Sequence, residues 1–204
     1  MSMDKLLQNI NHQSVRDMFR KDAFGALFLV DLGAPAVQNT AGIVADGNMK
    51  NGAYTLAGQP DVPRSLGITV TKATANDTMP ELTITGTDYN GDALVEKITP
   101  NNGDTSSGYK ETVNAFKAVA SIVGEGWVQA TATDQIQIGL GKKLGLPLAL
   151  KTKADMPIGF LNNAVQAHTP VVVDPPTVSG TTVDMSAGTY NATKVAQVLV
   201  RFSG

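Results

Sequence analysis

Residues Glu81–Ile98 read ELTITGTDYNGDALVEKI, and this stretch decides the fold. Two segments in which apolar and polar residues alternate flank the central sequence DYNGD, residues 88–92. Alternation with a period of two indicates β-strands, and an Asn-Gly pair between two such segments indicates a tight turn. The stretch therefore predicts an antiparallel β-hairpin.

The register of this hairpin depends on the length of its loop. A two-residue turn at Asn90 and Gly91 would mix polar with apolar side chains on each face of the sheet. A three-residue loop, Tyr89–Gly91, sorts the two kinds of side chain cleanly and places Gly91 at the left-handed position that glycine tolerates best. We therefore predict the three-residue loop. The face turned to the core then holds Leu82, Ile84, Leu94 and Ile98.

Glu96 is the exception in the predicted register, because it falls on the apolar face opposite Ile84. A buried carboxylate without a partner is costly. We expect Glu96 either to lie near the margin of the sheet or to meet a cation or a backbone donor, and that donor can also come from a neighbouring subunit.

The oxygen-rich loop also has some features of a calcium loop. An EF-hand loop that began at Asp88 would need glycine at its sixth position and glutamate at its twelfth. Those positions hold Ala93 and Thr99, so the sequence favours a turn over an ion site.

Period-two alternation recurs from Pro63 to the C-terminus and predicts further strands. Their expected core-facing residues are Leu66, Ile68 and Val70; Phe116, Ala118, Ala120 and Ile122; Ile136, Ile138 and Leu140; and Ala196, Val198, Val200 and Phe202. Many short strands separated by Gly, Asn and Pro predict a mainly β chain: an antiparallel β-sandwich or barrel, jelly-roll-like, over residues 61–204. Residues 169–190 are rich in proline and predict two short strands at most.

The first sixty residues follow a different pattern and predict an N-terminal helix and an extended attachment arm, residues 1–60. Apolar residues spaced three and four apart indicate a helix over residues 3–20, which packs either on its own domain or on a neighbouring subunit. Residues 22–60 have little periodicity and suggest a segment that is draped over a partner. The expected partner-binding residues are Leu7, Ile10, Met18, Phe19 and Phe24.

Composition limits the classes of function. The net charge is −2, so nothing attracts nucleic acid or an anionic membrane electrostatically. There are no cysteines, which excludes disulfides and thiolate chemistry. No apolar run approaches the roughly 20 residues of a membrane-spanning helix, and the N-terminal sequence does not resemble a signal peptide.

Candidate catalytic and binding motifs are weak. His12 and His168 have no metal-ligand partner at a recognised spacing, and we expect both at the surface. Residues 139–145, GLGKKLG, miss the dinucleotide-binding spacing by one residue, so we expect a turn with Lys142 and Lys143 at its exposed tip. Aromatic residues make up 5% of the chain with a single Trp127, which disfavours a sugar site. We expect no enzyme activity, cofactor or metal.

Four elements occur in order between Pro63 and Pro147: Pro-Arg before a strand, G-T-D-x-x-G-x-x-x-x-E-x-I, A-F-K-x-V, and I-x-I-G with L-G-L-P. In these elements the chain resembles a family of tailed-bacteriophage virion proteins. The resemblance implies a capsid decoration (cement) protein, made in the host cytoplasm and located on the capsid surface. Its implied partners are the major capsid protein and copies of itself in a homo-oligomer. A tail tube or fibre component and, less favoured, a carbohydrate-binding β-domain are the alternatives.

Overall fold

The structure, a computed structural model, describes residues 26–73, 77, 80–101, 107–128, 134–185 and 189–202. These residues form a mainly β fold of antiparallel sheets, as predicted. The strands are β1 (Ala26–Asp31), β2 (Val44–Asn48), β3 (Gly52–Ala53), β4 (Arg64–Thr71), β5 (Glu81–Thr87), β6 (Ala93–Ile98), β7 (Ser107–Glu111), β8 (Ala118–Glu125), β9 (Gln135–Gly145), β10 (Ile158–Leu161), β11 (Ala164–Gln166), β12 (Thr169–Val171), β13 (Thr182–Asp184) and β14 (Ala196–Phe202).

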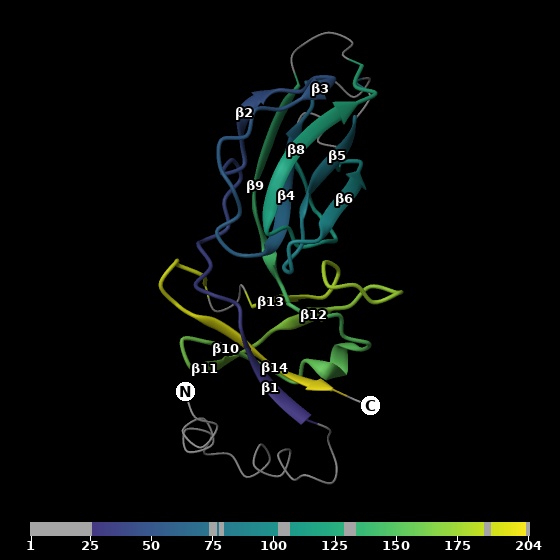
Figure 1. The fold of residues 1–204 in the computed structure, drawn as a ribbon. Helices are drawn as coiled ribbons and strands as arrows, with labels where there is room; N and C mark the ends of the chain where they lie inside the picture. Colours follow the sequence, from purple (N-terminus) through teal and green to yellow (C-terminus); the bar gives the residue numbers. More distant parts are fainter. Residues whose placement is uncertain are drawn as a thin grey trace.

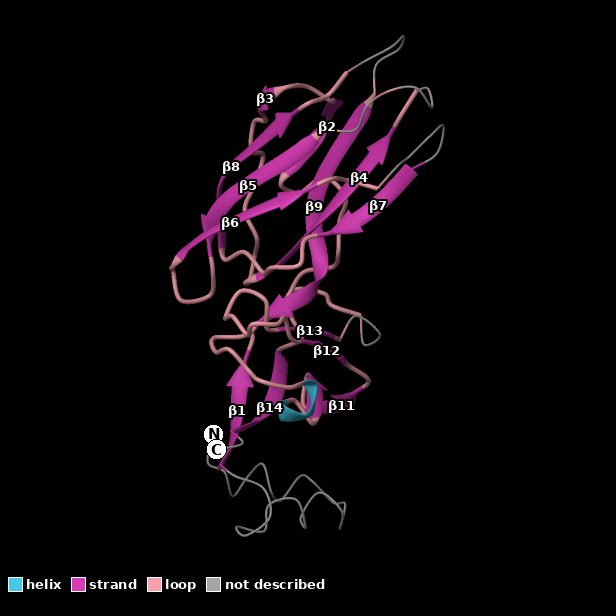
Figure 2. Ribbon diagram, turned by 90° about the vertical axis from the view of Figure 1, so that its right-hand side faces the viewer, coloured by secondary structure: helices cyan, strands magenta, loops and turns pink. Residues whose placement is uncertain are grey.

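Two antiparallel sheets face each other in the upper part of the molecule (Figures 1 and 2). One contains β2, β9, β4 and β7, and the other has the strand order β3-β8-β5-β6. Because alternate side chains of each strand point inward, the two sheets share one apolar layer, which we name the first core. Its buried residues are Ile43, Val44, Met49, Tyr54, Leu66, Ile68, Val70, Leu82, Ile84, Ile98, Phe116, Val119, Ile122, Ile136, Ile138 and Leu140.

The lower part of the molecule contains a separate sheet with the order β1-β14-β10-β11 (Figure 1). It packs with β12, β13 and the end of β9 around a second core. The buried residues of the second core are Leu32, Leu144, Leu146, Leu150, Met156, Leu161, Val183, Met185, Tyr190, Ala196, Val198 and Val200. Ala26 of β1 pairs with Phe202 of β14, so the described chain begins and ends side by side at this end.

Strand β9 connects the two cores. Near its start it pairs with β2, and at its end it pairs with β13, while β4 lies along its other edge. Its side chains Ile136 and Ile138 enter the first core, whereas Leu144 enters the second. A single continuous strand therefore aligns the two halves of the fold.

Residues 26–60, part of the expected arm, are built into this fold. They supply β1, β2 and β3 and four buried residues of the first core. Their backbone groups bond to the β domain, for example Ile43 N to Ile138 O (2.9 Å) and Tyr54 N to Ile122 O (2.9 Å). The partner of the weakly patterned segment is thus the chain's own sheets.

The expected helix over residues 3–20 lies outside the described residues. Within the described part of the chain, the helical element is a single 3-10 turn, η1 (Lys153–Asp155). The two short strands expected between residues 169 and 190 are present as β12 and β13.

The turn expected at residues 139–145 is wrong, because β9 runs without interruption from Gln135 to Gly145 and its Lys142 and Lys143 are half-buried. The glycines serve close packing instead of a turn. A Cβ atom on Gly139 would lie 2.2 Å from the carbonyl oxygen of Asn39 in the segment that crosses β9. The apolar alternation was therefore the correct signal, and the glycines were misleading.

The predicted face of β8 is also partly wrong. Ala118 and Ala120 are exposed, and Val119 between them is buried in the first core. The pairing with β5 shifts here, because Thr85 pairs with Ser121 and the next residue, Gly86, pairs with Val119. One extra residue on β8 forms a β-bulge, which reverses the side-chain alternation.

We expect Gly139→Ala to destabilise the protein by about 1–3 kcal/mol, because the added methyl group forces the Asn39 backbone away from β9. Gly47→Ala is the matched control on β2, since its Cβ would meet nothing closer than 3.8 Å. Urea unfolding followed by circular dichroism measures both. Equal stability of the two variants would contradict the close-packing explanation.

Candidate functional site

The hairpin of β5 and β6 has the register predicted for the three-residue loop. Leu82 pairs with Ile98 and Ile84 with Glu96, and Gly91 has a φ of +91°. The apolar residues of this face lie in or against the first core, as expected.

Hydrogen bonds between the Asp88 side chain and backbone amides fix the conformation of the loop. Its Oδ1 accepts hydrogen bonds from the amides of Asn90 (2.9 Å) and Asp92 (3.1 Å). The carbonyl of Asp88 accepts from Gly91 N at 3.1 Å. Asn90 and Gly91 are therefore residues of a structural turn. Among the described residues, no group of three or more acidic or histidine side chains is arranged to hold a metal ion.

Glu96 is buried and meets backbone donors of its own chain. Its carboxylate accepts hydrogen bonds from Val113 N at 2.7 Å and from Asn114 N and Nδ2 at 2.9 Å each. Residues 113 and 114 follow β7 of the opposite sheet. The carboxylate therefore ties the edge strand β6 to the other layer of the fold, and the expected backbone donor comes from within the chain.

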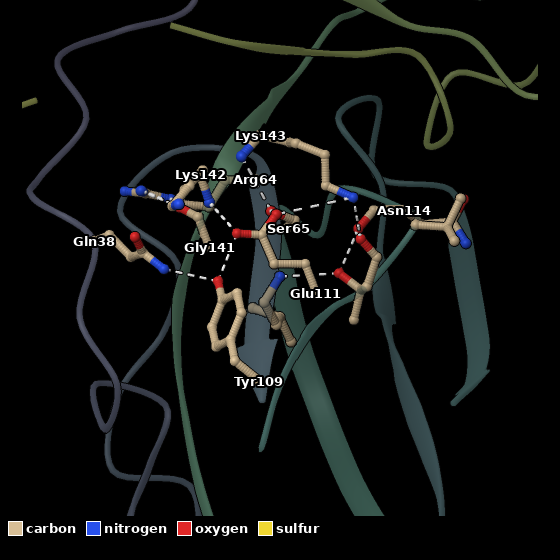
Figure 3. A network of polar contacts seen from close by, with 12 residues as sticks. Gln38, Arg64, Ser65, Tyr109, Glu111, Asn114, Gly141, Lys142 and Lys143 are labelled. Carbon is tan, nitrogen blue, oxygen red and sulfur yellow. Dashed lines mark hydrogen bonds and ion pairs between the residues drawn. The ribbon is translucent and has the colours of Figure 1, made fainter. Parts of the chain in front are cut away.

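Arg64 is the centre of a polar network between the two cores (Figure 3). Its side chain is fully buried. Nε donates to the carbonyl of Gly141 at 2.9 Å, and Nη2 donates to the same oxygen. Nη1 donates to Ala36 O at 3.1 Å and forms an ion pair with Asp61 at 3.0 Å. The guanidinium carbon lies 5.8 Å from the ring centre of Tyr190 in the second core. One side chain therefore joins four segments.

Glu111 of β7 extends this network on the outer side of the sheet (Figure 3). Its Oε1 accepts from the Tyr109 hydroxyl at 2.5 Å and from Lys142 N at 3.0 Å. Its Oε2 accepts from Ser65 Oγ at 3.3 Å and lies 3.9 Å from Lys143 Nζ. Both carboxylate oxygens are engaged by neighbouring strands, so the arrangement holds β4, β7 and β9 together.

Two tyrosines of this region remain protonated at neutral pH. Burial raises the pKa of Tyr109 well above its usual value, and the hydrogen bond to Glu111 raises it further. Burial likewise raises the pKa of Tyr190, whose hydroxyl accepts a hydrogen bond from Met185 N at 2.8 Å. The Tyr109 hydroxyl also accepts from Gln38 Nε2 at 2.7 Å. Both phenols serve as fixed donors and acceptors.

The other residues singled out in the sequence are placed as follows. The expected partner-binding residues Leu7, Ile10, Met18, Phe19 and Phe24, together with His12, lie outside the described residues. His168 is half-buried, with Nε2 2.9 Å from the carbonyl of Met156. Trp127 packs against the first core and donates from Nε1 to Asp134 at 3.2 Å.

Sequence reasoning missed the roles of Arg64 and Glu111. The available signal was a charged residue at the start of a strand whose other residues are apolar or small, RSLGITV. A long charged side chain in such a position requires several acceptors, because an unpaired buried charge is strongly unfavourable.

The fold and this network define a class: a mainly antiparallel β protein whose buried charged groups hold its strands together. A scan of protein-family models, a search of curated proteins and a search of solved structures each found no match. In the described part of the chain, no helix has the length and apolar character needed to cross a membrane.

Proposed function

We propose that this chain is a structural virion protein that binds the outside of a tailed-phage capsid and stabilises it as a decoration protein. The proposal rests on the resemblance between Pro63 and Pro147. The carrying observation is that residues of the shared elements hold the framework: Arg64 joins the cores, Gly91 closes the hairpin, and Glu96 ties the layers together. Residues that stabilise the fold in this way suit a protein whose function is to present a stable surface to its partners.

The proposed partners are the major capsid protein and copies of this chain. A protein that binds only the assembled shell shifts the equilibrium toward assembly. Closed symmetric oligomers are the usual form of such assemblies. We include in the proposal a jelly-roll-like β-sandwich and an N-terminal helix over residues 3–20 that attaches to the shell.

The described fold begins at Ala26, which pairs with Phe202 at the edge of the lower sheet. Residues 1–25 come before β1 in the sequence, and the buried core residues Leu32 and Ile43 come after its start. A deletion designed to remove attachment must therefore stop at residue 25, because a deletion to residue 60 also removes parts of both cores.

Heads assembled from the phage major capsid protein without this chain provide the test. We expect the full chain to co-sediment with expanded heads and to raise their temperature of disruption. Deletion of residues 1–25 is expected to weaken binding by at least about tenfold, or about 1.4 kcal/mol, and to leave the urea unfolding midpoint of the β fold unchanged. Absence of binding by the full chain, or binding to tails alone, would overturn the proposal.

Point variants separate the attachment face from the segment as a whole. Leu7→Ser, Ile10→Ser and Met18→Ser combined are expected to produce part of the effect of the deletion, and the addition of Phe19→Ser and Phe24→Ser is expected to reproduce it. The matched control changes polar residues of the same segment, Gln8→Ser, Asn11→Ser and Gln13→Ser, and is expected to bind normally. Equal binding by both sets would exclude the proposed face.

A further inference from the structure

A polar groove of about 230 Å³ lies on the outer face of the β2-β9-β4 sheet. It is lined by Asp46, Thr69, Thr71, Gln135 and Gln137. Residues of β4 and β9 alternate between this face and the first core, so the groove lies on the side opposite the apolar layer. We name it the sheet-face groove.

The strand register aligns the groove with an aromatic residue. Thr69 pairs with Tyr109 on one side and with Gln137 on the other, and residues paired across a sheet share a face. Asp46 lies in the bulge of β2, between the residues that pair with Ile138 and Ile136. Tyr109, Thr69, Gln137 and Asp46 thus form one row across four strands, a span of about 14 Å at the usual strand spacing.

The ring of Tyr109 lies next to this row: it leans over Gly67, one row further along β4, and is a neighbour of the groove and not part of its lining. A Cβ atom on Gly67 would lie 2.9 Å from the ring carbon Cε2 and 2.8 Å from the hydroxyl oxygen, so the ring lies over the glycine. The residue remains 36% exposed. Gln38 and Glu111 fix its hydroxyl, and therefore the orientation of the ring is set before any ligand binds (Figure 3).

Three side chains of the groove offer hydrogen-bonding groups that no described residue engages. None of the described residues forms a hydrogen bond with the side chains of Asp46, Thr69 or Gln137, whereas Gln135 donates to Asn48 at 2.9 Å and keeps an acceptor oxygen. These groups comprise a hydroxyl, an amide and a carboxylate, which can donate and accept. The lining contains no lysine or arginine, so its charge does not favour an anion.

We propose that the sheet-face groove and the Tyr109 ring bind a neutral oligosaccharide. Sugar hydroxyl groups match a mixture of amide, hydroxyl and carboxylate partners, and the C–H face of a sugar ring stacks on an aromatic face whose electrostatic potential is negative. The span from Tyr109 to Asp46 favours a chain of sugars over a single one. This binding is separate from capsid attachment, which we assign to residues 1–25.

The platform is Tyr109 and not Trp127, although the tryptophan is the usual first candidate for sugar stacking. Trp127 packs against the first core and its ring nitrogen is bound to Asp134. Tyr109→Leu and Tyr109→Phe therefore form the diagnostic pair, since phenylalanine keeps the stacking face and leucine removes it.

The test titrates the full chain with maltohexaose, cellohexaose and chitohexaose and follows backbone amide shifts by NMR. We expect at least one of them to shift the amides of Thr69, Tyr109 and Gln137. Tyr109→Leu is expected to weaken binding by at least about tenfold and Tyr109→Phe by less than about threefold. Gln137→Ala, an independent variant if Tyr109→Leu does not fold, is expected to weaken binding about fivefold.

Thr83→Ala is the matched control on the outer face of β5 in the other sheet and is expected to bind like the parent chain. Three results would each overturn the proposal: no shift with any of the three hexasaccharides, shifts confined to other strands, or normal binding by Tyr109→Leu. None of these three results would count against the proposed capsid attachment through residues 1–25, which is tested separately.

Discussion

Replacing Arg64 with alanine is expected to lower the free energy of unfolding by about 3–5 kcal/mol, the range for breaking a buried ion pair from one side. The substitution removes the two guanidinium donors to the carbonyl of Gly141. It also leaves the Asp61 carboxylate without the cation of its ion pair. It also leaves a cavity beside Tyr190. Because Arg64 lies between the two cores, both should be affected.

Urea unfolding measures this effect with two signals. Fluorescence of Trp127 reports on the first core, against which it packs, and far-ultraviolet circular dichroism reports on the whole fold. Arg64→Lys is expected to recover only part of the loss, since an ammonium group lacks the planar fork that reaches several acceptors. Lys97→Ala removes the exposed ion pair with Glu81 and serves as the control with little effect. A loss below about 1 kcal/mol for Arg64→Ala would contradict the buried-network explanation.

The hairpin was predictable from the sequence because its determinants are local. The alternation of Leu82 and Ile84 with threonines, and the glycine that permits a positive φ, are all within eighteen residues. Register then followed from sorting polar and apolar residues on two faces. Glu96 was recognised as an exception for the same reason, and only the identity of its donors required the structure.

The setting of Arg64 was not predictable, because its partners are distant in sequence. Residues 36, 61, 141 and 190 meet around it only after both cores have formed. No periodic pattern records such contacts. The same limit applies to the groove, whose lining from β2, β4 and β9 becomes adjacent through strand pairing over about ninety residues.

Residues 26–60 and β8 show two further limits. The first segment carries few apolar residues at regular spacing, yet its backbone amides bond to β8 and β9, and Ile43 is fully buried. Single anchors of this kind leave no periodic signal. In β8, one extra residue at a bulge moved Val119 inward, although the alternation read from Phe116 placed Ala118 and Ala120 there.

Glu96→Ala is expected to destabilise the protein by about 3 kcal/mol. The change leaves the amides of Val113 and Asn114 without an acceptor, and an unsatisfied buried donor costs about 1–3 kcal/mol. Since these residues belong to the segment after β7, the loss should release β6 from the opposite sheet. We therefore expect faster hydrogen–deuterium exchange at the Val113 and Asn114 amides, in addition to a lower urea midpoint.

Glu96→Gln separates the role of the carboxylate from that of the side-chain volume. Both oxygens of Glu96 accept hydrogen bonds from backbone N–H groups. The glutamine side chain keeps one acceptor oxygen, but its NH2 group is a donor and faces the other backbone N–H group. We expect an intermediate loss of about 1–2 kcal/mol. Glu81→Ala, at an exposed position of the same hairpin, controls for the loss of a negative charge and should leave exchange at residues 113 and 114 unchanged. If Glu96→Gln were as stable as the parent chain, the hydrogen bonds to the two carboxylate oxygens would not be the link between the two sheets. The packing of Ile84 and Ile98 would then have to account for that link.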